Sequence, residues 1–136
     1  TDKLGLIDSD KINKNIRKWI ANLDIKVPSS DAPVQTLSGG NQQRVVLAKW
    51  IATDPKILIL DGPTVGIDIA AKSSIHDIIK TLAKENRGII IISDEVQEVL
   101  YNCTKIIVMH KGKFIAELKA EETSETEIQN IINNAE

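Results

Sequence analysis

The seven residues LSGGNQQ, at positions 37–43, have the composition of a phosphate-binding loop. Ser38 ends a loop and precedes a helical pattern, so its hydroxyl is predicted to cap free backbone amides. Gly39 and Gly40 carry no side chains that would keep another molecule away from those amides. The helix dipole adds the equivalent of roughly half a positive charge at this end, which favours a phosphate. For SGG alone, a plain serine-capped helix after a flexible turn is the better explanation.

Two aspartates are candidates for a second polar site. Asp61 follows the apolar run Ile57–Leu60, the pattern of a strand buried on both faces of a parallel sheet. The carboxyl end of such a strand is where open α/β sheets bind ligands, although an aspartate there can also cap the following turn. Asp68 opens the next helical pattern, and a simple helix cap explains it almost as well as a functional role does.

Composition and charge exclude several classes of protein. The 136 residues are enough for one domain. The 17 basic residues are scattered and outnumbered by 19 acidic ones, so no nucleic-acid partner is predicted. Cys103 is the single cysteine and cannot form an internal disulfide, and no apolar run approaches the roughly 18 residues of a membrane span. The two histidines, His76 and His110, lie apart from any cysteine cluster, so no zinc-type site is expected. A cytosolic location fits these features best.

The periodicity of apolar residues predicts helices that alternate with strands. Helices are expected over residues 10–23, 39–52, from 68 to near 88, and after 93–95. Strands are expected over residues 57–60, 89–92, 106–109 and 114–118, with a turn at Lys111-Gly112-Lys113 between the last two. In the helix over 39–52 the expected core face consists of Val46, Leu47, Trp50 and Ile51. Ser124 and Glu127 have the spacing of a capping box for a helical tail. This alternation favours an α/β parallel sheet preceded by a mainly helical segment.

The string LSGGNQQ, followed by RVVLAKW and then ILILD, resembles the signature region of ATP-binding cassette ATPases. NQQ in particular is similar to the ATPase subunits of sugar importers of the ribose, galactose and xylose type. The resemblance covers about Ile7 to Leu118. It implies an incomplete P-loop NTPase sheet flanked by helices, from the C-terminal part of a second nucleotide-binding domain. Residues 7–52 would then form helical subdomain and signature helix, 55–118 the Walker B half of the core, and 119–136 a helical tail.

The resemblance also implies site residues and cofactors. In the family, signature residues reach across a dimer interface to the γ-phosphate of ATP held by the opposite cassette. The residues at these positions here are Ser38, Gly39, Gly40 and Gln42. Asp61 would be the Walker B aspartate, which holds Mg²⁺ through water, a role suited to a hard oxygen ligand. Asp68 falls at the position of the D-loop aspartate.

Three departures from the family pattern predict weak catalysis. Gly62 replaces the glutamate that activates water, and loss of a general base costs on the order of 10² to 10⁴ in rate. A glycine can also simply relax the turn before Pro63. Asp94 stands where many cassettes have a switch histidine; a carboxylate there would repel a phosphate, so Asp94 is better explained as a helix cap with Gln97 as its return partner. No stretch matches the phosphate loop G-x-x-x-x-G-K-[ST].

These features predict an inactive piece of an active enzyme. The intact subunit would be an ATPase coupled to sugar uptake, peripheral on the inner face of the cell membrane. Its partners would be the first cassette of the same subunit, the membrane permease subunits and, indirectly, a sugar-binding protein outside the membrane. The resemblance places the phosphate-loop strand between residues 89–92 and 106–109. Without it the sheet has a gap, so we expect the isolated piece to self-associate or to rearrange.

Two other interpretations stay open at this point. In one, the chain is a non-catalytic interaction module whose helical segment, residues 10–36, docks a membrane partner. In the other, it belongs to a soluble translation or repair ATPase of the same family. The resemblance of NQQ and of the helical segment to sugar-importer subunits argues against this second interpretation. The choice of sugar lies in the binding protein and the membrane subunits and is not encoded in these residues.

Overall fold

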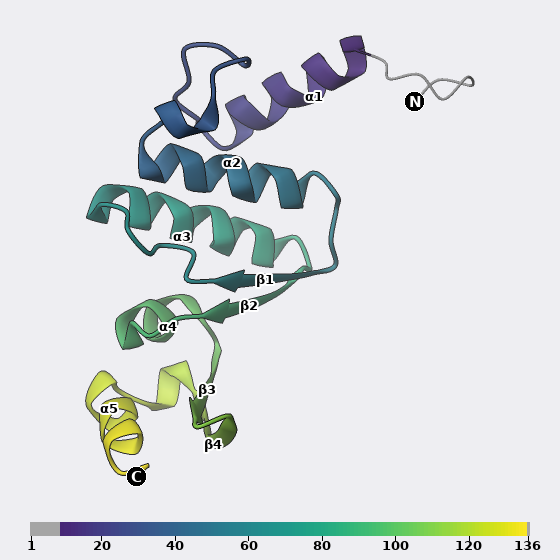
Figure 1. The fold of residues 1–136 in the computed structure, drawn as a ribbon. Coiled ribbons are helices and arrows are strands. Elements are labelled where there is room, and N and C mark those ends of the chain that lie inside the picture. The colour runs from purple at the N-terminus through teal and green to yellow at the C-terminus, as the bar shows by residue number, and fades with distance from the viewer. Residues whose placement is uncertain (1–8, 136) are drawn as a thin grey trace. The chain divides into compact units, whose positions relative to one another are not determined.

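The computed structural model describes residues 9–135, which form five α-helices and four strands (Figure 1). The helices are α1 (Ser9–Asn22), α2 (Gly39–Ile51), α3 (Ile69–Lys84), α4 (Val96–Asn102) and α5 (Glu125–Asn133). The strands are β1 (Ile57–Asp61), β2 (Gly88–Ile92), β3 (Lys105–His110) and β4 (Lys113–Lys119). Single turns of 3₁₀ helix lie at Val34–Thr36 and Ala120–Glu122. The expected elements are confirmed, with bounds that differ by one or two residues except at the end of α3, which stops at Lys84 and not near residue 88.

The described chain divides by packing into two units. The helical unit consists of the chain up to Lys56 together with Thr64–Leu82, and the strand unit consists of Ile57–Pro63 and the chain from Ala83 onward. The boundaries expected at residues 52, 55 and 118 separate segments of the family's domain and not units of packing. They stay a prediction.

The core of the helical unit lies on α2 and α3. Its buried apolar side chains on these helices are Leu47, Ala48, Ile51, Ile75, Ile79 and Leu82. The expected core face of α2 was partly wrong, because Val46 and Trp50 are 46% and 54% exposed. Successive helical residues are about 100° apart, so a face centred on Leu47 and Ile51 turns their preceding neighbours toward the side. The position of the partner helix decided which apolar pair was buried.

The strand unit contains two separate pairs of strands. β1 and β2 are parallel, with Ile57 opposite Gly88 and Asp61 opposite Ile92. β3 and β4 form an antiparallel hairpin whose turn residues, Lys111 and Gly112, both have positive φ, 46° and 77°. Positive φ at both central residues is the geometry that favours a two-residue hairpin turn. The parallel pair and the hairpin both confirm expectations.

The expected gap in the sheet lies between β2 and β3, which are not hydrogen-bonded to each other. The β1–β2 pair also has an exposed apolar face within the described residues. The side chains on this face are Ile57, Ile59, Ile90 and Ile92, each at least half exposed. β3 is supported instead by α5, since Ile106, Val108 and Ile128 form a buried cluster. Self-association through the open face stays a prediction.

The helix ends confirm one expected cap and correct another. Ser124 caps α5, accepting a hydrogen bond from the Glu127 amide at 3.2 Å. Asp94 does not cap α4, because that helix begins at Val96 and the residue before it is Glu95. The Glu95 amide donates to the Ser93 hydroxyl at 3.1 Å, which leaves Asp94 in a bend outside the helix.

The remaining end signals also differ in detail from expectation. Gln97 donates to the Glu125 carboxylate of α5 at 3.0 Å, and so does not act as a return partner for Asp94. α3 ends at Lys84. Asn86, two residues later, takes a left-handed φ of 60°, and Gly88 is the first residue of β2. The sequence offers Asp8 to Asp10 as capping candidates for α1, and Asp8 lies outside the described residues. No helix within residues 9–135 combines the length and apolar character that crossing a bilayer requires.

Candidate phosphate-binding site

Ser38 lies directly before α2 with an extended backbone, φ −61° and ψ 153°, which is the position of an N-cap. Its hydroxyl, however, makes no capping hydrogen bond to the helix, so that part of the expectation was wrong. Ser38 Oγ instead accepts a hydrogen bond from Asn41 Nδ2 at 2.9 Å. The helix ladder starts with the Gln42 amide, which donates to the Ser38 carbonyl at 2.9 Å. The preceding amides, of residues 39–41, have no acceptor inside the helix.

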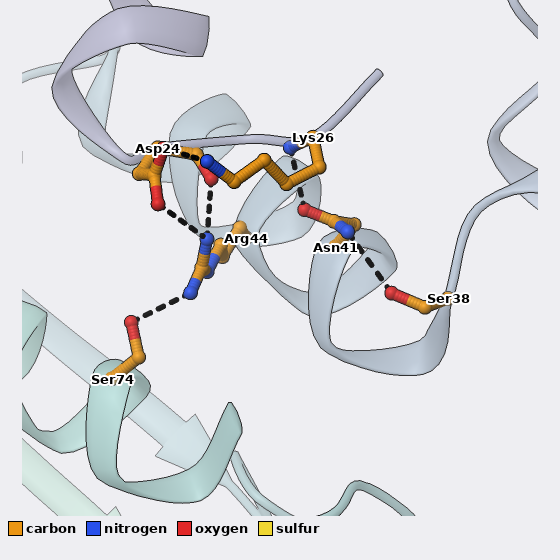
Figure 2. Close-up of polar contacts among 6 residues, drawn as sticks. All are labelled: Asp24, Lys26, Ser38, Asn41, Arg44 and Ser74. Atoms are coloured by element: carbon orange, nitrogen blue, oxygen red, sulfur yellow. Dashed lines mark hydrogen bonds and ion pairs between the residues drawn. The ribbon is translucent and has the colours of Figure 1, made fainter. Parts of the chain in front are cut away.

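Asn41 is the residue that sequence reasoning missed. Its side chain links α2 to a segment 15 positions earlier in the chain, since Asn41 Oδ1 accepts a hydrogen bond from the Lys26 backbone amide at 2.7 Å (Figure 2). The available signal was its position three residues after Ser38, the spacing of a capping box. That signal was weak because the motif normally has glutamate or glutamine at this position.

Gln42, by contrast, points its side-chain amide at the chain before the helix. Gln42 Nε2 donates to the Leu37 carbonyl at 2.8 Å, which anchors the end of the loop. Its expected part in nucleotide binding stays a prediction, and the structure adds a local reason for a glutamine at this position.

The two glycines at the start of α2 have different surroundings. A Cβ on buried Gly40 would lie 2.7 Å from the Ala71 Cβ of α3, a distance that real side chains do not tolerate. A Cβ on Gly39 would lie 3.3 Å from Ile67 Cγ2, the end of a side chain that can move. Gly40 is therefore required for the close approach of α2 and α3, whatever its amide binds. Gly39 is the glycine whose absence of a side chain leaves the helix start accessible.

A hollow of about 220 Å³ opens at this helix start within the helical unit. The residues that line it are Asp24, Lys26, Ser38, Gly40, Asn41, Arg44, Ala70 and Ala71. Two of these side chains are cationic and one is anionic, so the lining has an excess of positive charge. Together with the dipole of α2, this charge favours an anion over a neutral ligand.

Arg44 connects the segment after α1 to α3. Its guanidinium donates to the Asp24 carbonyl and, at 2.7 Å, to the Ser74 hydroxyl (Figure 2). The Asp24 carboxylate lies 2.9 Å from Lys26 Nζ and 3.7 Å from an Arg44 nitrogen. The Lys26 hydrogen bond and charge, with a smaller effect of Arg44, hold the pKa of Asp24 below its usual range. The contacts keep the backbone around Lys26 in place beside Asn41.

The lowered pKa of Asp24 predicts a pH-dependent contribution to stability. A carboxylate whose pKa is depressed by folding stabilises the native state above its unfolded pKa, and this contribution is lost as the pH falls below about 4. We expect Asp24→Asn to lower the free energy of unfolding at pH 7, and the difference from wild type to shrink toward pH 3. Asparagine also tolerates the positive φ of 48° at this position. Urea unfolding at both pH values measures this; an equal difference at both would contradict the assignment.

The strand unit holds Asp61 and Gly62. Asp61 ends β1 and is exposed, and the Gly62 amide donates to the Ile92 carbonyl at 2.9 Å. Gly62 has a φ of 54°, so the turn itself favours glycine, in agreement with the conformational interpretation. Residues 9–135 contain no group of three or more acidic, cysteine or histidine side chains arranged to hold a metal ion. Binding of Mg²⁺ by Asp61 stays a prediction.

Asp68 belongs to the helical unit and caps α3. Its Oδ1 accepts from the Ala71 amide at 3.0 Å, and its carbonyl accepts from the Lys72 amide at 2.9 Å. The capping interpretation is thus confirmed, and the D-loop role stays a prediction. Because Asp68 fixes the first turn of α3, it also positions Ala71 against Gly40.

Comparisons with known proteins place this chain among ABC transporter proteins. A family model described as ABC transporter matches residues 3–65, which include the signature string and β1. The galactose/methyl galactoside import ATP-binding protein MglA of Clostridium perfringens (strain 13 / Type A) is 42% identical over 93% of this chain. MglA of Pasteurella multocida (strain Pm70) is 44% identical, and the ribose import ATP-binding protein RbsA of Rhodococcus jostii (strain RHA1) 41%, each over 93% of this chain. The chain spans 25% of the length of each of these relatives.

Solved structures show the same fold. A nucleotide-free ATP-binding cassette from an ABC transporter superposes with a TM-score of 0.77 at 23% identity, covering 98% of this chain and 51% of that one. A dimeric ATP-binding cassette bound to ADP and phosphate superposes with a TM-score of 0.74 at 22% identity, covering 85% and 50%. With its signature string at a helix start and its parallel β1–β2 pair, the chain belongs to the ATP-binding cassette ATPases of ABC transporters.

Proposed function

We propose that this chain is a segment of the ATP-binding subunit of a sugar importer. Its role there is to supply the signature residues to an ATP site whose other half lies on another cassette. The observation that carries the proposal is the start of α2, where the hydroxyl of Ser38 is not used to cap the helix. The names of the relatives, which are galactose and ribose import proteins, support the choice of sugar uptake.

The chemistry of the helix start suits a terminal phosphate. The Ser38 hydroxyl and the amides of Gly39 and Gly40 are hydrogen-bond donors at the positive end of the α2 dipole. Hydrogen bonds to a charged acceptor contribute about 1.5–3 kcal/mol each. ATP with Mg²⁺ is the ligand we propose, captured first by the opposite cassette. The exposure of Ser38 leaves room for that approach.

The same proposal assigns the subunit its surroundings. A signature that completes a site on another cassette requires that cassette, which we place in the same subunit. A sugar importer would add permease subunits in the membrane and a sugar-binding protein that delivers cargo to them. The subunit would then act on the cytoplasmic face of the membrane.

The intact subunit, assembled with its permease in vesicles, tests this function. We expect ATP hydrolysis to rise when a sugar-loaded binding protein is added, with galactose and ribose as the first sugars to try. Hydrolysis that no sugar and no permease affects would favour the soluble type of cassette ATPase, and an absence of any hydrolysis would favour the scaffold.

Gly62 predicts that the Walker B site on this chain contributes little turnover. Glycine has no group that accepts a proton, and a missing general base costs on the order of 10² to 10⁴ in rate. We therefore expect Gly62→Glu to leave sugar-stimulated ATPase nearly unchanged in the vesicle assay. Gly62→Ala is the matched control, because it carries the same strain of a side chain at φ 54° without a carboxylate. A large rise with glutamate alone would show that the site was competent except for this residue.

A further inference from the structure

The side-chain amide of Asn41 has only one orientation consistent with its neighbours. The Lys26 backbone amide can only donate a hydrogen bond, so the Asn41 atom that lies 2.7 Å from it must be the oxygen. The NH₂ group then faces Ser38, 2.9 Å from Oγ. The orientation of this amide is thus dictated by a backbone group from a distant part of the chain.

The segment that presents the Lys26 amide is itself well anchored. Ile25, directly before it, is 7% exposed, and its amide donates to the Ile20 carbonyl at 2.9 Å. Arg44 contacts the Asp24 carbonyl on the same segment. The Lys26 amide is therefore a fixed donor, and Asn41 cannot rotate its amide by half a turn without placing an NH₂ group against an N–H group.

This orientation determines what the Ser38 hydroxyl can do. A hydroxyl has one hydrogen to donate and two lone pairs to accept with. Because Asn41 Nδ2 can only donate, Ser38 Oγ accepts from it, and the single Ser38 hydrogen is directed elsewhere. No hydrogen bond within the described residues has the Ser38 hydroxyl as its donor, so its hydrogen is available to an incoming acceptor. A phosphate oxygen is such an acceptor.

We propose that Asn41 is a positioning residue that keeps the Ser38 hydroxyl in its donor orientation. This inference rests on the proposed function, in which Ser38 donates to a terminal phosphate. Asn41 does not contact the phosphate; it acts by occupying a lone pair of Ser38 Oγ. The chain of donation runs from the Lys26 amide to Asn41, from Asn41 to Ser38, and from Ser38 to the anion.

Two substitutions at Asn41 separate orientation from mere size. Asn41→Asp keeps the shape and still accepts from the Lys26 amide, but its second oxygen can only accept, so it draws the Ser38 hydrogen away from the phosphate. We expect ATP turnover to fall by about 10² to 10³, the cost of losing one preorganised donor. Asn41→Ala frees the hydroxyl to rotate without turning it away. We expect a smaller loss of about tenfold, the size of one net hydrogen bond.

A double-mutant cycle in the intact subunit tests whether Asn41 acts through Ser38. We expect Asn41→Ala to lower kcat in the wild-type background and to have almost no further effect, within about twofold, in a Ser38→Ala background. The KM for ATP should change little, because the opposite cassette captures the nucleotide. Asn102→Ala is the matched control; it removes an asparagine amide that donates to the Glu98 carbonyl, far along the chain from the signature, and should leave kcat unchanged.

Each outcome of the cycle decides something. If Ser38→Ala has no effect, the proposed function itself is wrong. If Ser38→Ala lowers kcat but Asn41→Ala costs as much without the hydroxyl as with it, Asn41 has a structural role and the positioning inference fails. If neither Asn41 variant changes kcat, the inference also fails. Thermal unfolding of all variants identifies any whose loss of activity comes from loss of the fold. If one of the two Asn41 variants unfolds, the other is compared with wild type in its place.

Discussion

Ser38→Arg is expected to reduce ATP turnover by the intact importer subunit by at least about 10²-fold, the typical cost of removing one preorganised donor from a site of developing negative charge. The substitution removes the hydroxyl and places a long side chain across the amides that begin α2. Ser38 is exposed and its hydroxyl does not cap the helix, so the free energy of unfolding should stay close to that of wild type. Sugar-stimulated phosphate release in the vesicle assay gives the rate, and urea unfolding gives the stability.

Ser30→Arg is the control for this experiment. Ser30 is also an exposed serine of the helical unit, in the loop before the signature, and it takes no part in the hollow. The same added bulk and charge should leave turnover unchanged there. Unaffected turnover in Ser38→Arg would remove the basis of the proposed function, because a signature that can carry an arginine across its amides does not contact a phosphate.

Gly40→Ala should destabilise the fold, which makes it the second large effect. A methyl group at this position would lie 2.7 Å from the Ala71 Cβ, so α2 and α3 would have to separate. Overpacking of this kind costs about 1–3 kcal/mol. Alanine forms helix better than glycine by up to about 1 kcal/mol, which offsets only part of this cost. Chemical denaturation monitored by the far-UV signal of the helices measures the net loss.

Two further variants show whether contact between the helices is the cause. Ala71→Gly removes the methyl group that the new side chain would meet, so the double variant Gly40→Ala/Ala71→Gly should be more stable than the sum of the two single changes predicts. Gly39→Ala serves as the control, because the nearest atom, Ile67 Cγ2 at 3.3 Å, belongs to a side chain that can move. Equal destabilisation by alanine at positions 39 and 40 would contradict the packing explanation.

The elements of this fold were predictable because their signals are local. The Lys111-Gly112 turn, the Ser124 and Glu127 spacing and the apolar runs of β1 and β2 each act over a few neighbouring residues. Where the predicted cap of α4 was wrong, a neighbouring side chain accepted a hydrogen bond in its place. Asp94 was the expected cap of α4, but the Ser93 hydroxyl took the Glu95 amide and the helix began one residue later than a cap at Asp94 allows.

The sequence by itself determined the family, the location of the signature at a helix start, and the absence of a carboxylate at Gly62. Only the tertiary structure decided how the signature is arranged internally: Gly40 fits against Ala71, and Ser38 accepts from Asn41 instead of capping its helix. The physical reason is that a hydroxyl or an amide bonds to whichever partner lies within about 3 Å. For Asn41 that partner is the Lys26 amide, which is brought beside it by folding and not by proximity in the chain.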